Sequence, residues 1–195
     1  MEDPAFERLA SDRLVLRRFR ASDAASLTAY RNDPEVARFQ GWDVPYGEDE
    51  AHTLIASLAG LSPGTPGRWF QIAMALPATD ELVGDFGVYT SGDGRQAKVG
   101  FTLSRAHQGR GLAFEGLTLL QPYLFRELGL HRLYADTDAR NVRSRRLLAR
   151  AGFREEGLLV DAVWAKGEWC SGVIFARLAR EWRAAADLAG GGAWA

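Results

Sequence analysis

Gln108-Gly109-Arg110-Gly111-Leu112-Ala113 forms a glycine-rich turn near the middle of a chain of 195 residues. The glycines at 109 and 111 carry no Cβ and tolerate a positive φ, so that successive backbone N–H groups can converge on one anion. The β-branched and aromatic residues of 97–103 predict a strand before the turn, and the apolar spacing over 112–128 predicts a helix after it. Since a helix N-terminus attracts anions, the turn is predicted to hold a phosphate group.

Two better-known phosphate-binding sequences do not match this turn. A P-loop requires Gly-x-x-x-x-Gly-Lys-Ser/Thr, and the turn has no lysine that could reach a terminal phosphate. A dinucleotide motif Gly-x-Gly-x-x-Gly that starts at Gly109 needs a small residue at position 114, where Phe114 stands. The sequence therefore disfavours nucleotide hydrolysis and NAD binding. An ordinary strand-to-helix turn remains the alternative for these six residues read alone.

The turn resembles the Gln/Arg-x-x-Gly-x-Gly/Ala motif of the GNAT superfamily of acyl-CoA-dependent N-acetyltransferases, with Gln108, Gly111 and Ala113 at the matching positions. The resemblance implies acetyl-CoA as the cosubstrate and no metal. It also implies that the CoA pyrophosphate lies against the whole turn, namely Gln108, Gly109, Arg110, Gly111, Leu112, Ala113 and Phe114.

A second segment is similar to the Rim-type branch of that superfamily, the N-terminal acetyltransferases of ribosomal proteins and their relatives. Asn141-Val-Arg-Ser144 opens a helix-like segment that ends before Gly152-Phe153. By resemblance, this helix lies beside the pantetheine arm of CoA, and Asn141 contacts that arm. Asn141 and Ser144 also suit the start of a helix, and Gly152 stands where a C-terminal capping glycine belongs.

The similarity runs in the expected order over about residues 12–182, from Arg13-Leu-Val-Leu-Arg17 through Glu156-Gly157 to Ala179-Arg-Glu-Trp182. We therefore expect one domain over residues 1–195, with a core over about 12–182 and a flexible tail over 188–195. Hydrophobic residues make up 47% and charged residues 25% of the chain, which is typical of a globular domain large enough for one core.

The expected fold class is mixed α/β. The residue patterns predict strands at 13–19, 69–76, 81–90, 97–103 and 131–138, two more strands within 155–178, and helices at 22–31, 48–60, 112–128 and 142–151. Pro122 should kink the long helix, because it has no backbone N–H. The resemblance implies a mostly antiparallel central sheet, flanked by helices and splayed around the cofactor between 97–103 and 131–138.

Charge and cysteine content limit the partners and the compartment. The net charge of −1 gives no general attraction to nucleic acid, so no nucleic-acid partner is expected, and the arginine-rich segment 140–154 is expected to be mostly solvated. Cys170 is the only cysteine, which excludes an intrachain disulfide. We find no apolar run of about 18 residues and no charged-then-apolar leader, so we expect a cytoplasmic protein that does not enter a membrane.

Acetyl transfer to an amine needs a polarised carbonyl, a proton acceptor for the amine and a proton donor for the departing thiolate. By resemblance, backbone N–H groups of Phe101, Thr102 and Leu103 polarise the carbonyl. Many GNAT enzymes have a tyrosine as the proton donor where this chain has Leu148, so Ser144 is the expected substitute.

Carboxylates are the candidates for the proton acceptor. Asp161 is favoured because it lies near the position of a glutamate in Rim-type relatives, followed by Asp136; Asp85 and Asp138 are further candidates. For each carboxylate, a surface or capping role is the alternative. Lys98 and Ser171 stand where relatives often have acidic residues, so the acceptor side is expected to differ in charge.

Several other features bear on the ligands. Arg110 and Arg146 are expected to contact the CoA phosphates, because a planar guanidinium suits phosphate oxygens. An acceptor groove or core packing are the alternatives for a group of aromatic residues: Trp42, Tyr46, Trp69 and Trp164. The acceptor is a protein N-terminal amine or a small-molecule amine, and the donor is acetyl-CoA or another acyl-CoA. A non-catalytic acyl-CoA-binding module is the alternative function. A homodimer is expected because members of the family often dimerise.

Overall fold

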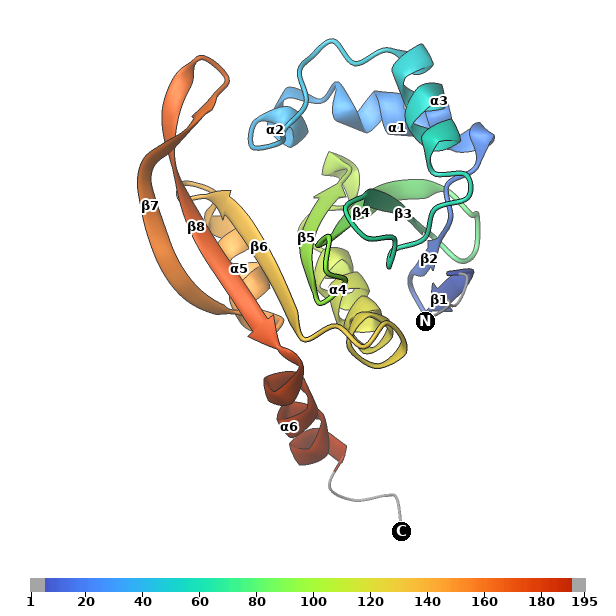
Figure 1. Cartoon of the computed structure of the whole chain (residues 1–195). Coiled ribbons are helices and arrows are strands. Elements are labelled where there is room, and N and C mark those ends of the chain that lie inside the picture. The colour runs from blue at the N-terminus through green and yellow to red at the C-terminus, as the bar shows by residue number, and fades with distance from the viewer. Residues whose placement is uncertain (1–5, 191–195) are drawn as a thin grey trace.

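The structure is a computed structural model that describes residues 6–190. Within these residues, a single eight-stranded sheet has the strand order β1-β2-β3-β4-β5-β6-β8-β7 (Figure 1). The elements are β1 (Arg8–Ala10), β2 (Val15–Arg17), α1 (Ala24–Arg31), α2 (Pro34–Ala37), α3 (Glu48–Ser57), β3 (Trp69–Ala75), β4 (Leu82–Thr90), β5 (Gln96–Leu103), α4 (Leu112–Pro122), β6 (Arg132–Asp138), α5 (Val142–Arg150), β7 (Arg154–Ala165), β8 (Glu168–Leu178) and α6 (Ala179–Gly190).

The sheet is antiparallel except at its centre, where β5 and β6 run parallel. Their pairing covers only Gln96–Lys98 of β5 and Arg132–Tyr134 of β6, although β5 continues to Leu103 and β6 to Asp138. The two strands therefore separate after Lys98, as Figure 1 shows. This confirms the predicted splay between 97–103 and 131–138.

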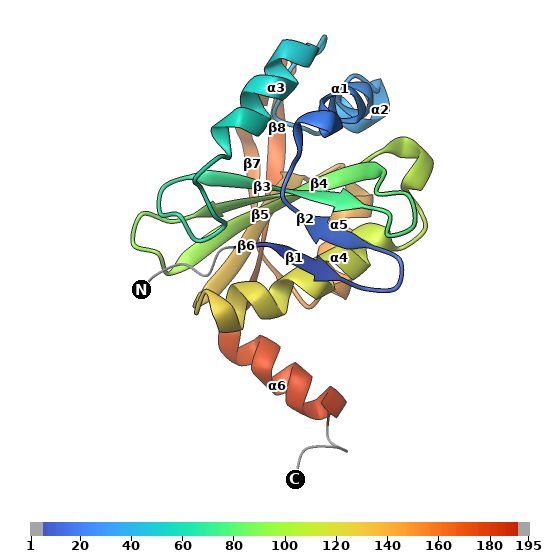
Figure 2. The same ribbon diagram turned by 90° about the vertical axis from the view of Figure 1, so that its right-hand side faces the viewer.

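Helices cover both faces of the sheet (Figures 1 and 2). The main core includes Leu117 and Leu120 of α4, Leu148 of α5, and Val99 of β5. On the opposite face, a second core cluster joins Leu27 of α1 to the β3 side of the sheet. The splayed strands therefore have α4 and α5 on one side and the α1–α3 layer on the other.

Most predicted elements are confirmed within a few residues. The predicted helix 112–128 becomes π-helical over Tyr123–Glu127, directly after Pro122, as expected where proline removes a ladder hydrogen bond. Residue patterns missed three elements: β1, α2 and α6. β1 has only three residues and α2 only four, although Asp33 caps α2 by accepting the Glu35 N–H and Pro34 occupies its first turn. Of the predicted tail 188–195, residues 188–190 belong to α6, and 191–195 lie outside the described residues.

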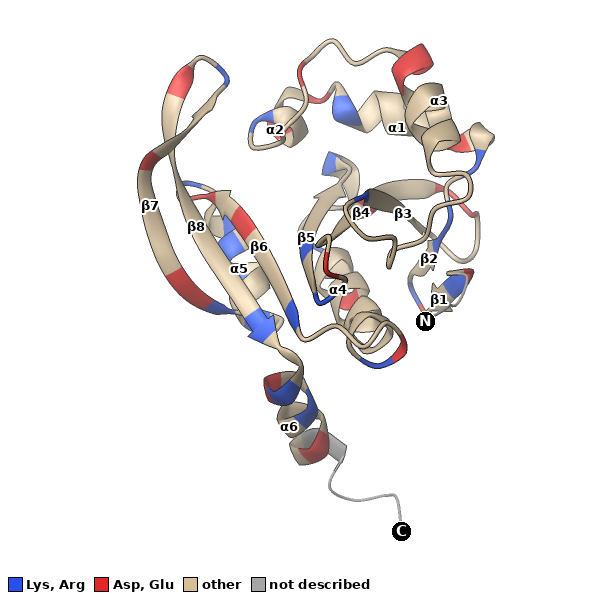
Figure 3. Ribbon diagram, in the orientation of Figure 1, with Lys and Arg blue, Asp and Glu red and all other residues tan. Residues whose placement is uncertain are grey.

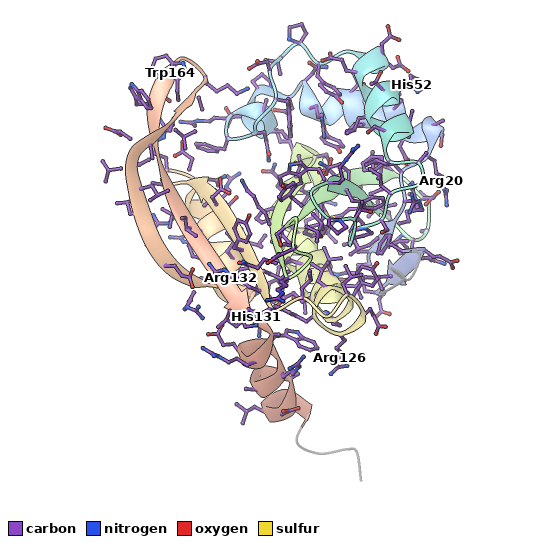
Figure 4. The ribbon with its side chains drawn as sticks, in the orientation of Figure 1. Arg20, His52, Arg126, His131, Arg132 and Trp164 are labelled. Carbon is purple, nitrogen blue, oxygen red and sulfur yellow. The ribbon has the colours of Figure 1, made fainter. Side chains whose placement is uncertain are left out.

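The β7–β8 hairpin reaches past the rest of the sheet toward the loop between α2 and α3 (Figure 1). Lys166 at its tip donates a hydrogen bond to the Trp42 carbonyl and lies 3.2 Å from Asp43 Oδ1. Trp164 and Trp169 stack edge to face near the same tip, where Figure 4 labels Trp164. The hairpin and the α2–α3 loop thus meet on the α1 side of the splay.

Candidate active site

The glycine-rich turn has the backbone that an anion site requires. Gly109 and Gly111 have φ values of +75° and +80°, which side chains other than glycine rarely adopt. Gly111 is the N-cap of α4, and no side chain caps the first turn of that helix. The N–H groups at the start of α4 are therefore available to an anion, so this turn suits the pyrophosphate of CoA.

Two contacts join this turn and the start of α4 to α5. Gln108 donates its Nε2 hydrogen to the Leu103 carbonyl (2.9 Å) and accepts a hydrogen bond at Oε1 from Arg143 (3.3 Å). The Arg150 guanidinium lies 3.9 Å from the centre of the Phe114 ring. α5 thus supplies arginines to the cofactor side of the sheet, where Figure 3 shows its basic residues behind β6. Arg143, Arg146 and Arg150 are all exposed, and of these three only Arg146 was predicted from the sequence to contact phosphate.

A groove of about 720 Å³ lies along the outer side of the turn and α4. Its lining includes Arg13 from the β1–β2 turn, Arg110, Phe114 and Arg150. Arg13 also forms an ion pair with Glu115 and donates to the Arg110 carbonyl (3.2 Å). Three guanidinium groups and an aromatic ring therefore surround the glycine turn, a combination that suits phosphates joined to a nucleoside.

Alternate residues of β5 direct their backbone N–H and C=O groups into the gap between β5 and β6. The register pairs Thr102 with Asp85, and the Ser104 N–H donates to the Val83 carbonyl (2.8 Å). Because antiparallel residues alternate between bonding their partner and facing away, Thr102 bonds β4 while Phe101 and Leu103 face the splay. Of the three predicted carbonyl donors, Phe101 and Leu103 are therefore directed into the gap, and Thr102 is turned away from it.

Asn141 and Ser144 stand at the start of α5, on either side of Arg143. The Asn141 side chain accepts the Ser144 N–H (3.1 Å), so the capping interpretation of Asn141 is confirmed. Ser144 is half-buried in the first turn of α5. At the other end, Gly152 has a φ of +85° and its N–H donates to the Ala149 carbonyl, which confirms the predicted capping glycine.

Asp136 is the carboxylate nearest to the point where β5 and β6 part. Its Oδ1 lies 2.5 Å from Lys98 Nζ, and both side chains are partly exposed. Side chains alternate between the two faces of a sheet, so Lys98 and Thr102, four residues apart on β5, lie on the same face. Thr102 is paired with Asp85, which contacts Tyr30 of α1, and the Lys98–Asp136 pair therefore lies on the α1 face of the sheet. Lys98 Nζ also lies 6.0 Å from the Trp69 ring centre. Lysine at position 98 therefore pairs with a carboxylate across the gap.

The other three candidate carboxylates are occupied or remote. Asp161 was favoured from the sequence, but it lies on the edge strand β7, and β8 separates that strand from β6. The pairing of β7 with β8 is irregular at this point, and the Asp161 N–H donates a hydrogen bond to Ser171 Oγ (3.0 Å). Asp138 binds Arg140, whose hydrogen bonds lower the pKa of that carboxyl. Asp85 is buried and accepts the Tyr30 hydroxyl (2.6 Å); its burial raises its pKa. Of the four candidates, Asp136 is the one that combines a position beside the gap with a half-exposed side chain, although it too forms an ion pair, with Lys98.

The loop over 38–46 covers the α1 side of the splay. The Arg31 guanidinium lies between the rings of Trp42 (4.5 Å) and Tyr46 (4.7 Å) and 3.7 Å from Asp85 Oδ2. Trp42 and Tyr46 therefore pack around a buried arginine, while Trp69 lies on the open sheet face beside Lys98. The sequence analysis named Trp42 and Tyr46 of this loop but not Arg31, because no motif marks its contact with the distant Asp85.

Comparisons with known proteins agree with this geometry. Residues 13–154 match the model of the family described as the acetyltransferase (GNAT) domain. The chain belongs to the GNAT acetyltransferase family. It is 33% identical over 178 residues to an uncharacterised N-acetyltransferase, p20, of Bacillus licheniformis, with 90% of this chain and 98% of that protein covered. It is 31% identical over 183 residues to the [ribosomal protein uS5]-alanine N-acetyltransferase of Escherichia coli K12, with 90% and 92% covered.

The solved structures extend the match to a CoA complex. Mycobacterium smegmatis RimJ in complex with CoA-disulfide superimposes with a TM-score of 0.75 at 25% identity, covering 95% of this chain and 96% of that one. The predicted GNAT fold and its Rim-type resemblance are confirmed, and so is the prediction of an acyltransferase. GNAT acetyltransferases use acetyl-CoA, and the glycine turn and splay of this GNAT enzyme suit that cosubstrate. In the described part of the chain, no helix has the length and apolar character needed to cross a membrane.

Proposed function

We propose that this GNAT enzyme transfers the acetyl group of acetyl-CoA to the α-amino group of a polypeptide N-terminus, by direct attack in a ternary complex. The observation that carries the proposal is the separation of β5 and β6 after Lys98, with α4 and α5 on one face of the sheet and α1 on the other. The donor and the acceptor can therefore bind on opposite sides and meet in the gap. The 31% identity to an enzyme named for a ribosomal-protein alanine supports a protein N-terminus as the acceptor.

On the donor side, residues of the turn and of α5 hold the cosubstrate. The N–H groups from Gly109 to Ala113 bind the pyrophosphate, and Arg110, Arg143 and Arg150 neutralise phosphate charge. Asn141 lies at the start of α5, where it contacts the pantetheine arm. Bound acetyl-CoA supplies an activated acetyl group and a thiol leaving group. The Phe101 and Leu103 N–H groups orient the carbonyl oxygen and stabilise its developing negative charge.

Proton transfer uses residues from both faces. The amine must be neutral to attack, and Asp136 is the carboxylate that takes its proton, directly or through a water molecule. As the new C–N bond forms and the C–S bond breaks, the Ser144 hydroxyl donates a proton to the sulfur. Asp136 lies on the α1 face and Ser144 on the α5 face, so each is on the side where its partner would enter.

Thiol release from acetyl-CoA tests the proposal directly. The intact protein is incubated with acetyl-CoA and a panel of N-terminal peptides, polyamines and aminoglycosides, and the acetylated product is located by mass spectrometry. We expect turnover of peptides, with the acetyl group on the α-amine. Turnover of small amines alone would overturn the protein-acceptor proposal, and turnover of a longer acyl-CoA in preference to acetyl-CoA would overturn the donor. CoA binding by calorimetry without any turnover would favour a binding module instead.

The proposal also includes a cytoplasmic setting and a homodimer. β7 is an edge strand whose exposed residues include Leu158, Val160 and Val163, and a second copy could cover them. Light scattering coupled to gel filtration should then give about twice the chain mass of 21.5 kDa. A monomer mass at micromolar concentration would remove the dimer from the proposal.

A further inference from the structure

The loop over 38–46, here called the acceptor loop, is fixed to α1 at two points. Trp42 Nε1 donates to the Arg31 carbonyl (3.1 Å). Asn32 binds the Tyr46 backbone twice: its Oδ1 accepts the Tyr46 N–H and its Nδ2 donates to the Tyr46 carbonyl, both at 2.8 Å. Since the hairpin tip also holds Trp42 through Lys166, the loop lies across the α1 side of the gap in a defined position.

One side chain of this loop reaches the splayed strand itself. Gln40 Nε2 donates a hydrogen bond to the Phe101 carbonyl at 3.3 Å, although the two residues are 61 positions apart. In a strand, the N–H and C=O of one residue face the same edge, so Gln40 contacts β5 at the edge where the Phe101 N–H faces the gap. Gln40 and Phe101 are both half-buried. The amide of Gln40 is therefore the polar group of the acceptor loop that touches the expected reaction centre.

We propose that Gln40 is a specificity residue that binds the incoming amine. With Nε2 committed to the Phe101 carbonyl, the Oε1 atom of the same rigid amide is held in one place and has two lone pairs to offer. An amine that attacks a carbonyl held at the Phe101 N–H directs its lone pair at the carbonyl carbon and its N–H groups away from it. Gln40 Oε1 accepts one of those N–H groups. This inference rests on the proposed transfer to an amine at this gap.

A neutral amide suits this task better than a second carboxylate would. Asp136, the proposed proton acceptor, reaches the gap from β6 and is already paired with Lys98. A glutamine oxygen can orient an amine without adding a negative charge that would favour the unreactive ammonium form. The acceptor is thus oriented from the loop and deprotonated from β6.

The alternative is that Gln40 only holds the acceptor loop on β5. Two variants separate the roles, because each lacks the N–H donor to Phe101. Gln40→Met keeps the length of the side chain and has no strong acceptor, whereas Gln40→Glu keeps oxygen atoms that accept hydrogen bonds. If Gln40 binds the amine through oxygen, Gln40→Glu retains more acceptor affinity than Gln40→Met. If it only anchors the loop, the two variants lose affinity alike, or Gln40→Glu loses more.

The experiment measures binding and turnover in the same proteins. Acceptor affinity is measured by calorimetry, with the peptide that the wild-type enzyme acetylates titrated into CoA-saturated protein, where no reaction can occur. Steady-state kinetics give KM for the peptide and for acetyl-CoA, and thermal unfolding reports folding. Gln96→Met is the matched control, since Gln96 is half-buried at the other end of β5.

We expect Gln40→Met to weaken peptide binding about 3- to 10-fold, the usual effect of one neutral hydrogen bond, with KM for acetyl-CoA unchanged. Gln40→Glu should lie between Gln40→Met and the wild type, and Gln96→Met should match the wild type. Peptide affinity of Gln40→Met within a factor of two of wild type would overturn the inference, as would equal losses for peptide and acetyl-CoA. If the wild-type enzyme acetylates no peptide, the proposed function fails first, and the inference is then tested with whichever amine is acetylated.

Discussion

Lys98 of β5 and Asp136 of β6 form an ion pair across the point where the two strands separate, with 2.5 Å between Nζ and Oδ1. The pair lies at the end of the paired stretch of these strands, where Lys98 and Tyr134 are the last Cα partners. It therefore fixes a carboxylate at the edge of the gap, on the face from which we propose that the acceptor enters. No other carboxylate among the four sequence candidates has this position.

Asp136→Asn should lower kcat/KM for the peptide at least about 10-fold, because the amide cannot take a proton from the amine. Asp161→Asn should change it less than about threefold, since Asp161 lies on β7 and bonds Ser171. Steady-state rates at neutral pH measure both variants. A larger loss in Asp161→Asn would return the role to the residue that the sequence favoured.

Gly111→Ala should weaken acetyl-CoA binding at least about fivefold and destabilise the protein by about 1 kcal/mol, because alanine is strained at a φ of +80°. A Cβ at Gly111 would meet only the Arg13 guanidinium, at 3.8 Å, so the expected destabilisation does not come from a steric clash. Gly94→Ala is the control, since Gly94 has a φ of +69° in the β4–β5 turn, away from the cofactor side. Calorimetry should show weaker CoA binding in Gly111→Ala only, while denaturant unfolding should show similar destabilisation in both. Equal CoA affinity of the two variants would contradict the anion role of the turn.

The sequence predicted the parts of the site that are local in the chain. The turn over 108–113 and the capped helix after Asn141 depend on neighbouring residues, and both have the predicted conformation. The separation of β5 and β6 was also predicted, although from family resemblance and not from the residue pattern. Local rules of conformation and a long collinear similarity were enough for these features.

The contacts that were missed join distant segments. Gln40 meets Phe101 and Arg150 meets Phe114 only because the sheet order brings their elements together. The position of Asp161 could not be predicted for the same reason: β8 lies between β6 and β7, and the register of β7 is irregular around this residue. Neither strand order nor a register shift leaves a periodic signal in a single sequence.

Arg150→Ala should weaken CoA binding about 3- to 10-fold, because it removes a cation beside the glycine turn and its stacking on Phe114. Arg146→Ala on the same helix should have less than a twofold effect, because Arg150 lines the groove beside the glycine turn and Arg146 does not. Calorimetric Kd values for CoA at low and high salt measure both variants, and the salt dependence should be smaller in Arg150→Ala. If Arg146→Ala binds CoA more weakly than Arg150→Ala does, the phosphates lie nearer the N-terminus of α5 than we propose.

Asp85→Ala should destabilise the protein by about 2 to 4 kcal/mol, because it leaves the Tyr30 hydroxyl and the Arg31 guanidinium buried without their carboxylate. Tyr30→Phe removes only the hydroxyl and should cost about 1 kcal/mol. Urea unfolding at neutral pH measures both. A stable Asp85→Ala variant without catalytic activity would contradict this structural role and make Asp85 a candidate base.

Glu156 should make the stability depend on pH in the acidic range. Hydrogen bonds from Arg132, and then from Arg154, lower the pKa of its carboxyl from 4.5 to about 2. A carboxyl with a depressed folded-state pKa stabilises the fold fully above its unfolded pKa, and this contribution is lost as the pH falls through the folded pKa. The stability difference between wild type and Glu156→Gln should therefore be constant above about pH 5 and shrink steadily between about pH 4.5 and pH 2. Urea midpoints at pH 6, 4 and 3 measure that difference, and a difference that stays the same down to pH 3 would mean that these ion pairs do not stabilise the β6–β8–β7 edge.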